Sequence, residues 1–327
     1  MRGLAGLCTV IAAGCYRPDA SLGVPCASNG ACPSGQICDP NASPPRCVDV
    51  LTGIDAAPVP DDAPLAPDAP VDVDALPWQS PTRVILTLPA GAVDDPTLTD
   101  DRLELYFNFQ NDIFVATRAS VTAPWGTPVR VAELSSTANE TTPEIAGDGL
   151  TIYFASDRVG TLGGADIWIA TRPARGQPWS TPTDVMPLNS AGSDVNPTLS
   201  SDGLAILLAS TRGGGADDVF ISTRASVTAA WTAPSPLAEL DDPVAADQGA
   251  MLASDGLSVV FASTRRDAGD LFVARRASPQ GRFDPPEPIA ELDTAVSDSD
   301  PWMSSDKRHL VFSSTRDGTQ ALYESAR

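Results

Sequence analysis

The feature that most constrains the fold is an internal repeat with a period of about 50 residues, which fills residues 78–327. Each copy has a central apolar segment with an aspartate two residues before it; in the middle three copies glycine follows the aspartate, a turn signal between two strands. A third and a fourth apolar segment follow. The central segments are LELYFNFQN (103–111), LTIYFASDR (150–158), LAILLASTR (204–212), LSVVFASTR (257–265) and RHLVFSSTR (308–316). Each repeat therefore predicts four short strands.

The two ends of the repeat array are complementary. The fifth copy stops at Arg327, the last residue of its third strand, while Trp78, Pro81 and Val84 reproduce the fourth-strand spacing ahead of the first copy. An open solenoid would instead need polar caps. Pairing the first strand with the last sheet closes a ring and removes exposed strand edges. We therefore predict an all-β fold, a five-bladed β-propeller of four-stranded blades closed by an N-terminal velcro strand.

Residues 1–14 have the pattern of a signal peptide, a positive start followed by an uncharged stretch too short to span a bilayer. The small residues that end at Gly14 directly precede Cys15 and resemble the lipobox of bacterial lipoproteins. The resemblance implies cleavage after Gly14 and lipidation of Cys15, with several acyl chains giving stable anchoring in the cell envelope, the outer membrane being favoured. An ordinary secretory signal, with Cys15 in a disulfide, is the alternative.

The four remaining cysteines after such processing all lie within residues 15–47, in a stretch too rich in Gly, Pro, Asn and Asp for a hydrophobic core. They are Cys26, Cys32, Cys38 and Cys47. In an exported segment this pattern predicts a small module with two disulfides, whose pairing the sequence leaves open. Zinc binding is the alternative, although the spacing lacks C-x2-C pairs. Residues 48–77, rich in Pro, Ala and Asp, predict an extended disordered linker before the propeller at 78–327.

The repeat also carries a family resemblance. Its pattern P-x-[LI]-x-x-D-G-L-x-[IV]-x-F-x-S-x-R, followed by G-x-D-[IL]-[WF], is similar to the WD40-like repeats of TolB-type propellers. Blade 1 departs from it with Arg102 and Asn111 at the glycine and arginine positions. The resemblance implies a noncatalytic platform in the cell envelope that binds a protein or a glycan.

Two sets of charged residues are expected on one face of the ring, above the central channel. The loops after each second strand supply arginines, and the loops that enter each blade supply acids. The arginines are Arg158, Arg212, Arg265 and Arg316, and the candidate acids are Asp94, Asp95, Glu140, Asp194, Asp241, Asp242, Asp298 and Asp300. We expect the arginines to form structural ion pairs with loop carboxylates or carbonyls. The alternative is an acidic mouth that binds Ca²⁺ or a basic partner loop.

Composition narrows the function further. With 42 acids against 21 bases, the net charge of −21 disfavours nucleic-acid binding. His309 is the only histidine, so Ser-His-Asp and Cys-His catalysis lack parts. The enzymatic alternative is a glycoside hydrolase, because five-bladed propellers resembling arabinanases use separated carboxylates around the channel. The acids here recur at equivalent positions with none set apart, so we expect no catalytic residues and no cofactor, Ca²⁺ aside.

Overall fold

The structure, a computed structural model, describes residues 25–27, 31–32, 36–39, 45–49, 72–266 and 268–327. The chain divides into two compact units, 1–70 and 71–327. The predicted signal peptide, Cys15 and most of the predicted linker lie outside the described residues. Among the described residues, no helix has the length and apolar character needed to cross a membrane.

The first unit contains a two-stranded antiparallel sheet of β1 (Gln36–Asp39) and β2 (Arg46–Asp49). Disulfides join Cys26 to Cys38 and Cys32 to Cys47, with Cα–Cα distances of 5.7 Å in both. This confirms the predicted disulfides and selects one of the three possible pairings. The four sulfurs are bonded in two pairs, so none of them is a thiolate that could bind zinc.

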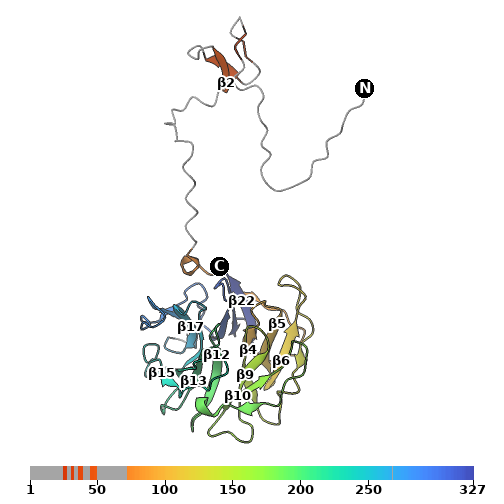
Figure 1. Ribbon diagram of the computed structural model, residues 1–327, viewed down its shortest axis with the longest axis vertical. Coiled ribbons are helices and arrows are strands. Elements are labelled where there is room, and N and C mark those ends of the chain that lie inside the picture. The colour runs from red at the N-terminus through yellow and green to blue at the C-terminus, as the bar shows by residue number, and fades with distance from the viewer. Residues whose placement is uncertain (1–24, 28–30, 33–35, 40–44, 50–71, 267) are drawn as a thin grey trace, which may run out of the picture. The chain divides into compact units, whose positions relative to one another are not determined.

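The second unit is the predicted propeller of five four-stranded antiparallel sheets (Figure 1). In blades 1 to 4 the strands follow chain order from the channel outward, and in blade 5 the N-terminal strand β3 (Thr82–Arg83) takes the outermost place. Blade 1 contains β4 (Val93–Leu98), β5 (Glu104–Phe109), β6 (Asp112–Thr117) and β7 (Val129–Arg130); blade 2 contains β8 (Glu140–Ile145), β9 (Thr151–Ser156), β10 (Asp166–Thr171) and β11 (Thr183–Asp184); blade 3 contains β12 (Asp194–Leu199), β13 (Ala205–Ser210), β14 (Asp218–Thr223) and β15 (Ser235–Pro236); blade 4 contains β16 (Asp247–Leu252), β17 (Ser258–Ser263), β18 (Asp270–Arg275) and β19 (Glu287–Pro288); blade 5 contains β20 (Asp298–Met303), β21 (His309–Ser314), β22 (Ala321–Ala326) and β3 (Thr82–Arg83).

The ring closes as the sequence predicts. The N-terminal strand β3 pairs with β22 near the chain's end, with Arg83 opposite Tyr323 and Thr82 opposite Glu324. Figure 1 shows β22 beside the N-terminal blade that contains β4 and β5. Side chains on both faces of the second strands are buried, because each blade packs against two neighbours. The core consequently lies between blades.

A second arginine set supports each blade at its outer part. The arginine that follows every third strand lies over the aromatic ring that precedes the fourth strand, 4.1 to 4.5 Å from its centroid. The pairs are Arg118–Trp125, Arg172–Trp179, Arg224–Trp231, Arg276–Phe283 and Arg327–Trp78. The last pair joins the two ends of the unit. The cation–π contact between Arg327 and Trp78 thus adds a side-chain interaction to the strand pairing that closes the ring.

The unit also begins earlier than the sequence analysis places it. A short 3₁₀ helix, η2 (Val73–Ala75), precedes β3 inside the span assigned to the linker. The carboxylate of Asp74 lies 2.5 Å from Lys307 Nζ and 2.7 Å from Arg327 Nη2. These ion pairs fasten residues 72–77 to blade 5, so the segment belongs with the propeller.

Candidate functional site

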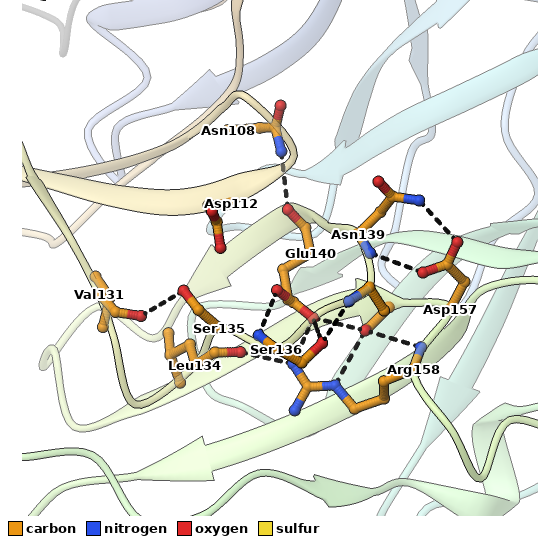
Figure 2. Close-up of polar contacts among 12 residues, drawn as sticks. Asn108, Asp112, Val131, Leu134, Ser135, Ser136, Asn139, Glu140, Asp157 and Arg158 are labelled. Atoms are coloured by element: carbon orange, nitrogen blue, oxygen red, sulfur yellow. Dashed lines mark hydrogen bonds and ion pairs between the residues drawn. The ribbon is translucent and has the colours of Figure 1, made fainter.

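The arginines after the second strands each make one repeated set of contacts, shown for blade 2 in Figure 2. Glu140 Oε1 accepts hydrogen bonds from Arg158 Nη2 at 2.9 Å and from Ser156 Oγ at 3.1 Å. The other carboxylate oxygen accepts from the backbone N–H of Ser136 at 2.9 Å. Arg158 also donates to the carbonyl of Leu134, 2.6 Å away, in the segment entering the blade. One arginine thereby ties the entry loop, the first strand and the second strand together.

Three further blades repeat this arrangement. Each arginine lies 2.5 to 2.7 Å from an aspartate at the start of its own blade's first strand. The pairs are Arg212–Asp194, Arg265–Asp247 and Arg316–Asp298. The four acid side chains of this ring are almost completely inaccessible, at 0 to 1% exposure. Three candidate acids, Glu140, Asp194 and Asp298, are therefore held inside ion pairs and cannot present a free carboxylate to a partner.

Blade 1 lacks this ion pair because all three of its members differ. Val93 takes the acid position, Phe109 the serine position and Asn111 the arginine position. Phe109 is buried and meets the ring of Phe114 edge-on at 5.4 Å. Gln110 and Asn111 both have positive φ and form a two-residue turn, which joins β5 directly to β6. An apolar contact replaces the ion pair, so blade 1 has no buried carboxylate to neutralise here.

Two other candidate acids belong to one entry loop. Asp242 Oδ1 accepts from the backbone N–H groups of Val244 and Ala245, and so closes the loop that leads into blade 4. Asp241 is exposed beside Asp218. Burial, followed by the proximity of Asp241, raises the pKa of Asp218 to about 6. The carboxyl group of Asp241 in this loop therefore interacts with that of Asp218 at the start of β14.

A second ring of five equivalent residues lines a small cavity in the channel. Each sits at a β-bulge in an inner strand and adopts a left-handed conformation, with φ between 46 and 59°. The five are Asp95, Thr142, Asn196, Gly249 and Asp300. The side chain of one residue caps the next bulge: Thr142 N donates to Asp95 Oδ2 and Asn196 N donates to Thr142 Oγ1, both at 3.1 Å. Glycine suits blade 4, because a Cβ at position 249 would lie 3.2 Å from the Cα of Asp300, a tight contact that the backbone of Asp300 would have to relieve.

Three of the candidate acids meet in this ring, where blades 1 and 5 adjoin. The carboxylate oxygens of Asp94, Asp95 and Asp300 lie within 4.8 Å of one another. Burial raises the pKa of Asp300 to about 7, and the negative charge of Asp94 adds to the shift. Burial, then Asp94 and Asp300, raise the pKa of Asp95 well above its usual value of 3.8. Asp300 therefore retains its proton up to near-neutral pH.

The trio could contribute carboxylate oxygens to a hard cation. Ca²⁺ takes six to eight oxygen ligands in proteins, so three carboxylates would form part of its shell. Asn196 Nδ2 donates to Asp300 Oδ1 at 2.7 Å, which occupies one of these oxygens. The arrangement suits a shared proton as well as it suits a metal.

One channel residue was not singled out from the sequence. Glu144 follows the repeated proline of blade 2, at a position that Thr97, Thr198, Met251 and Trp302 occupy in the other blades. Its Oε1 accepts from the backbone N–H of Leu199, and its Oε2 accepts from Thr97 Oγ1, both at 2.9 Å. Burial raises its pKa to about 7. Comparing the residues directly before and after the repeated proline in the five blades would have identified Glu144 and set Asp95 and Asp300 apart from the other acids.

Comparisons with known proteins agree with the fold. The chain matches no protein-family model and no curated protein sequence. Among solved structures, the endo-arabinase of Bacteroides thetaiotaomicron VPI-5482 aligns at 13% identity over 75% of this chain and 97% of that one, with a TM-score of 0.56. The α-L-arabinofuranosidase of Lactobacillus brevis aligns at 15% identity over 72% and 91%, with a TM-score of 0.50.

A TolB structure also aligns, with a lower TM-score. The putative TolB of Agrobacterium tumefaciens aligns at 18% identity over 68% of this chain and 70% of that one, with a TM-score of 0.46. The propeller is therefore similar in fold to the two glycoside hydrolases named above. At these identities the similarities concern the fold alone.

Proposed function

We propose that this chain is a noncatalytic, lipid-anchored protein of the cell envelope, whose propeller binds a protein or glycan partner. The lipobox-like sequence before Cys15 supports the anchor, and the TolB-type repeat pattern supports the binding role. A disulfide-bonded module is consistent with an oxidising, exported environment.

The observation that supports a noncatalytic role is the state of the channel carboxylates. Glycoside hydrolysis uses two carboxyl groups about 5–5.5 Å or about 6.5–9.5 Å apart, with the scissile bond between them. The ring acids are instead bonded to arginines, and the trio is too close together to admit a sugar. The cavity between the trio and Glu144 measures about 30 Å³, which is space for a water molecule.

The alternative function, a carboxylate-dependent glycosidase, rests on Glu144 and Asp300. Both have a pKa of about 7, which suits a general acid. Purified protein should be assayed on arabinan, xylan and peptidoglycan fragments from pH 5 to 8, beside Glu144→Gln and Asp300→Asn variants. We expect no turnover by any of the three. Turnover by the native chain that either substitution abolishes would replace the binding proposal with the enzymatic one.

Two experiments test the proposal, the first its lipid anchor and the second its binding role. The first fractionates cells that produce either the native chain or Cys15→Ser, with Cys8→Ser as the matched control. We expect only Cys15→Ser to leave the membrane fraction; membrane retention of that variant would contradict lipid anchoring. The second crosslinks the native chain in cells and identifies its neighbours by mass spectrometry. A reproducible envelope partner is expected, and failure to enrich any partner would leave the propeller a structural role alone.

A further inference from the structure

The face of the propeller that carries the turns between first and second strands contains a cavity of about 510 Å³. It fills the channel beyond Glu144 and branches sideways between blades 2 and 3, where Tyr153 and Ile169 form one wall. Exposed turn residues, among them Asp148 and Asp202, lie at its rim. The volume falls within the range of small-ligand sites, about 300–1,000 Å³.

The branch lies at a gap between blades that lacks the ion pair found in the neighbouring gap. Between blades 1 and 2, Glu104 at the start of β5 pairs with Arg172 at 2.5 Å and closes the gap. Between blades 2 and 3, Thr151 takes the place of Glu104. Arg224, the counterpart of Arg172, donates from Nε to the Gly203 carbonyl at 2.7 Å, stacks on Trp231 and interacts with Tyr153. The shorter threonine leaves the space open.

The cavity is negatively charged at both its depth and its rim. Glu144 is 6% exposed, and none of the ion pairs within the described residues involves it. Its two hydrogen bonds come from neutral donors, so a buried carboxylate stands there without a cation. Asp148 and Asp202 likewise make no ion pair in the described part of the chain, whereas the equivalent Asp101 and Asp255 pair with Arg175 and Lys307.

The remaining wall is apolar and partly aromatic. Trp302, Met251 and Met303 line the channel part of the cavity beside Glu144. An indole face and a methionine-rich wall accommodate an aliphatic stem, and the indole attracts a cation. Arg224 also lines the cavity, but its single positive charge is outnumbered by the carboxyl groups of Glu144, Asp148 and Asp202.

We infer that this cavity is a binding site for an organic cation, an ammonium or guanidinium group on an aliphatic stem, with Glu144 as the counter-charge. The stem lies against the tryptophan and methionine wall, and the rim aspartates attract the cation before it enters. The cation belongs either to a free amine or to a lysine or arginine side chain of a partner polypeptide. This inference goes beyond the proposed function, since partner capture at another surface would survive its failure.

The test is calorimetric titration of the full chain in detergent at pH 8, where Glu144 is largely ionised. The free probes are n-pentylammonium, its neutral isostere 1-pentanol and pentanoate. The peptide probes are acetyl-Ala-Lys-Ala-amide and the same peptide with norleucine for lysine. We expect the cations to bind at least about tenfold more tightly than their neutral counterparts and pentanoate to bind least. Binding by the peptide but not by the free amine would identify a polypeptide as the source, and the converse a free amine.

Variants assign the effect to the cavity. Glu144→Gln should weaken cation binding at least about tenfold and leave 1-pentanol unchanged, whereas the exposed Glu133→Gln should alter neither. Ser201→Lys adds a positive charge at an exposed rim position without touching the core, and should weaken cation binding even if Glu144→Gln folds poorly. Equal affinity for the ammonium and the alcohol, or unchanged cation binding by folded Glu144→Gln, would overturn the inference. Preference for pentanoate would do so too and would make Arg224 the anchor.

Discussion

Replacing Arg212 by asparagine should cost about 3 kcal/mol of folding free energy. The side chain donates to Asp194 Oδ1 and to the Leu188 carbonyl, both at 2.5 Å, and its Nε donates to Ser210 Oγ at 2.9 Å. Breaking a buried ion pair costs about 3–5 kcal/mol because a buried charge is left unpaired. We expect the lower end, since Asp194 keeps donors from Ser190 and Ser210 and Arg212 is 17% exposed. For a domain of this size the melting temperature should fall by roughly 10 °C.

The assay is urea unfolding at pH 7 with calorimetry of the melting transition. Blade 1 supplies the key comparison, because it has Val93 and Asn111 where blade 3 has Asp194 and Arg212. The double variant Asp194→Val/Arg212→Asn should be more stable than Arg212→Asn alone, since it removes the stranded carboxylate. Arg282→Asn, at an 81% exposed side chain, should change stability by less than about 0.5 kcal/mol.

Two results would refute this account of the ring. A cost below about 1 kcal/mol for Arg212→Asn would mean that the ion pair is dispensable. A double variant no more stable than the single one would mean that the cost comes from lost arginine contacts and not from the buried charge.

Three further predictions concern other parts of the propeller. The pKa of Glu144 is about 7 in the folded chain against 4.5 when exposed, so the folded state retains a proton that the unfolded state releases between these pH values. Native stability should therefore fall from pH 4.5 to pH 7, and Glu144→Gln should remove up to about 3 kcal/mol of that fall in urea titrations at each pH; parallel pH profiles would contradict it. Trp78→Ala should cost about 3 kcal/mol of folding free energy, because it empties a buried site under Arg327. Unchanged stability of this variant in calorimetry would show that Trp78 does not help to close the ring. Asp74→Asn should speed hydrogen exchange of residues 72–77 while the rest of the propeller exchanges as before, because the pairs with Lys307 and Arg327 are lost; unchanged exchange would count against those pairs.

The fold could be predicted because each of its determinants is local and repeated. The turns at the repeated aspartate fix where first and second strands meet, and the aromatic residue that precedes each fourth strand marks the outer edge. Trp78 shows the same spacing ahead of the first copy, so ring closure follows from counting. The pairing of β3 with β22 confirms it. No such repetition exists for the disulfide pairing, which depends on the path of the chain between cysteines.

Which acids pair with arginines and which face the channel could not be predicted, because a β-bulge in each inner strand determines it. In a regular strand Asp298 and Asp300, two residues apart, would point to the same face. The register of β20 shifts between Ser299 and Trp302, so Asp298 bonds to Arg316 of its own blade while Asp300 turns onto the channel axis. A sequence pattern that treats both as one acidic ring cannot distinguish the structural carboxylate from the one left in the channel.

The trio of Asp94, Asp95 and Asp300 lies where blade 1 meets blade 5. Blade 5 is built from both ends of the propeller unit, since it contains β3 as well as β20 to β22. Gln320 Nε2 donates to Asp94 Oδ1 at 2.9 Å, and the backbone N–H of Asp95 donates to Ser313 Oγ at 3.2 Å. These bonds join blade 1 to blade 5 across a point where three carboxylates repel one another when ionised. Protonation, or a cation that the trio holds, would relieve that repulsion in the same way. The repulsion between these carboxylates therefore acts at the junction between blades 5 and 1, where the N-terminal strand closes the ring. This junction should be the first to loosen as pH rises.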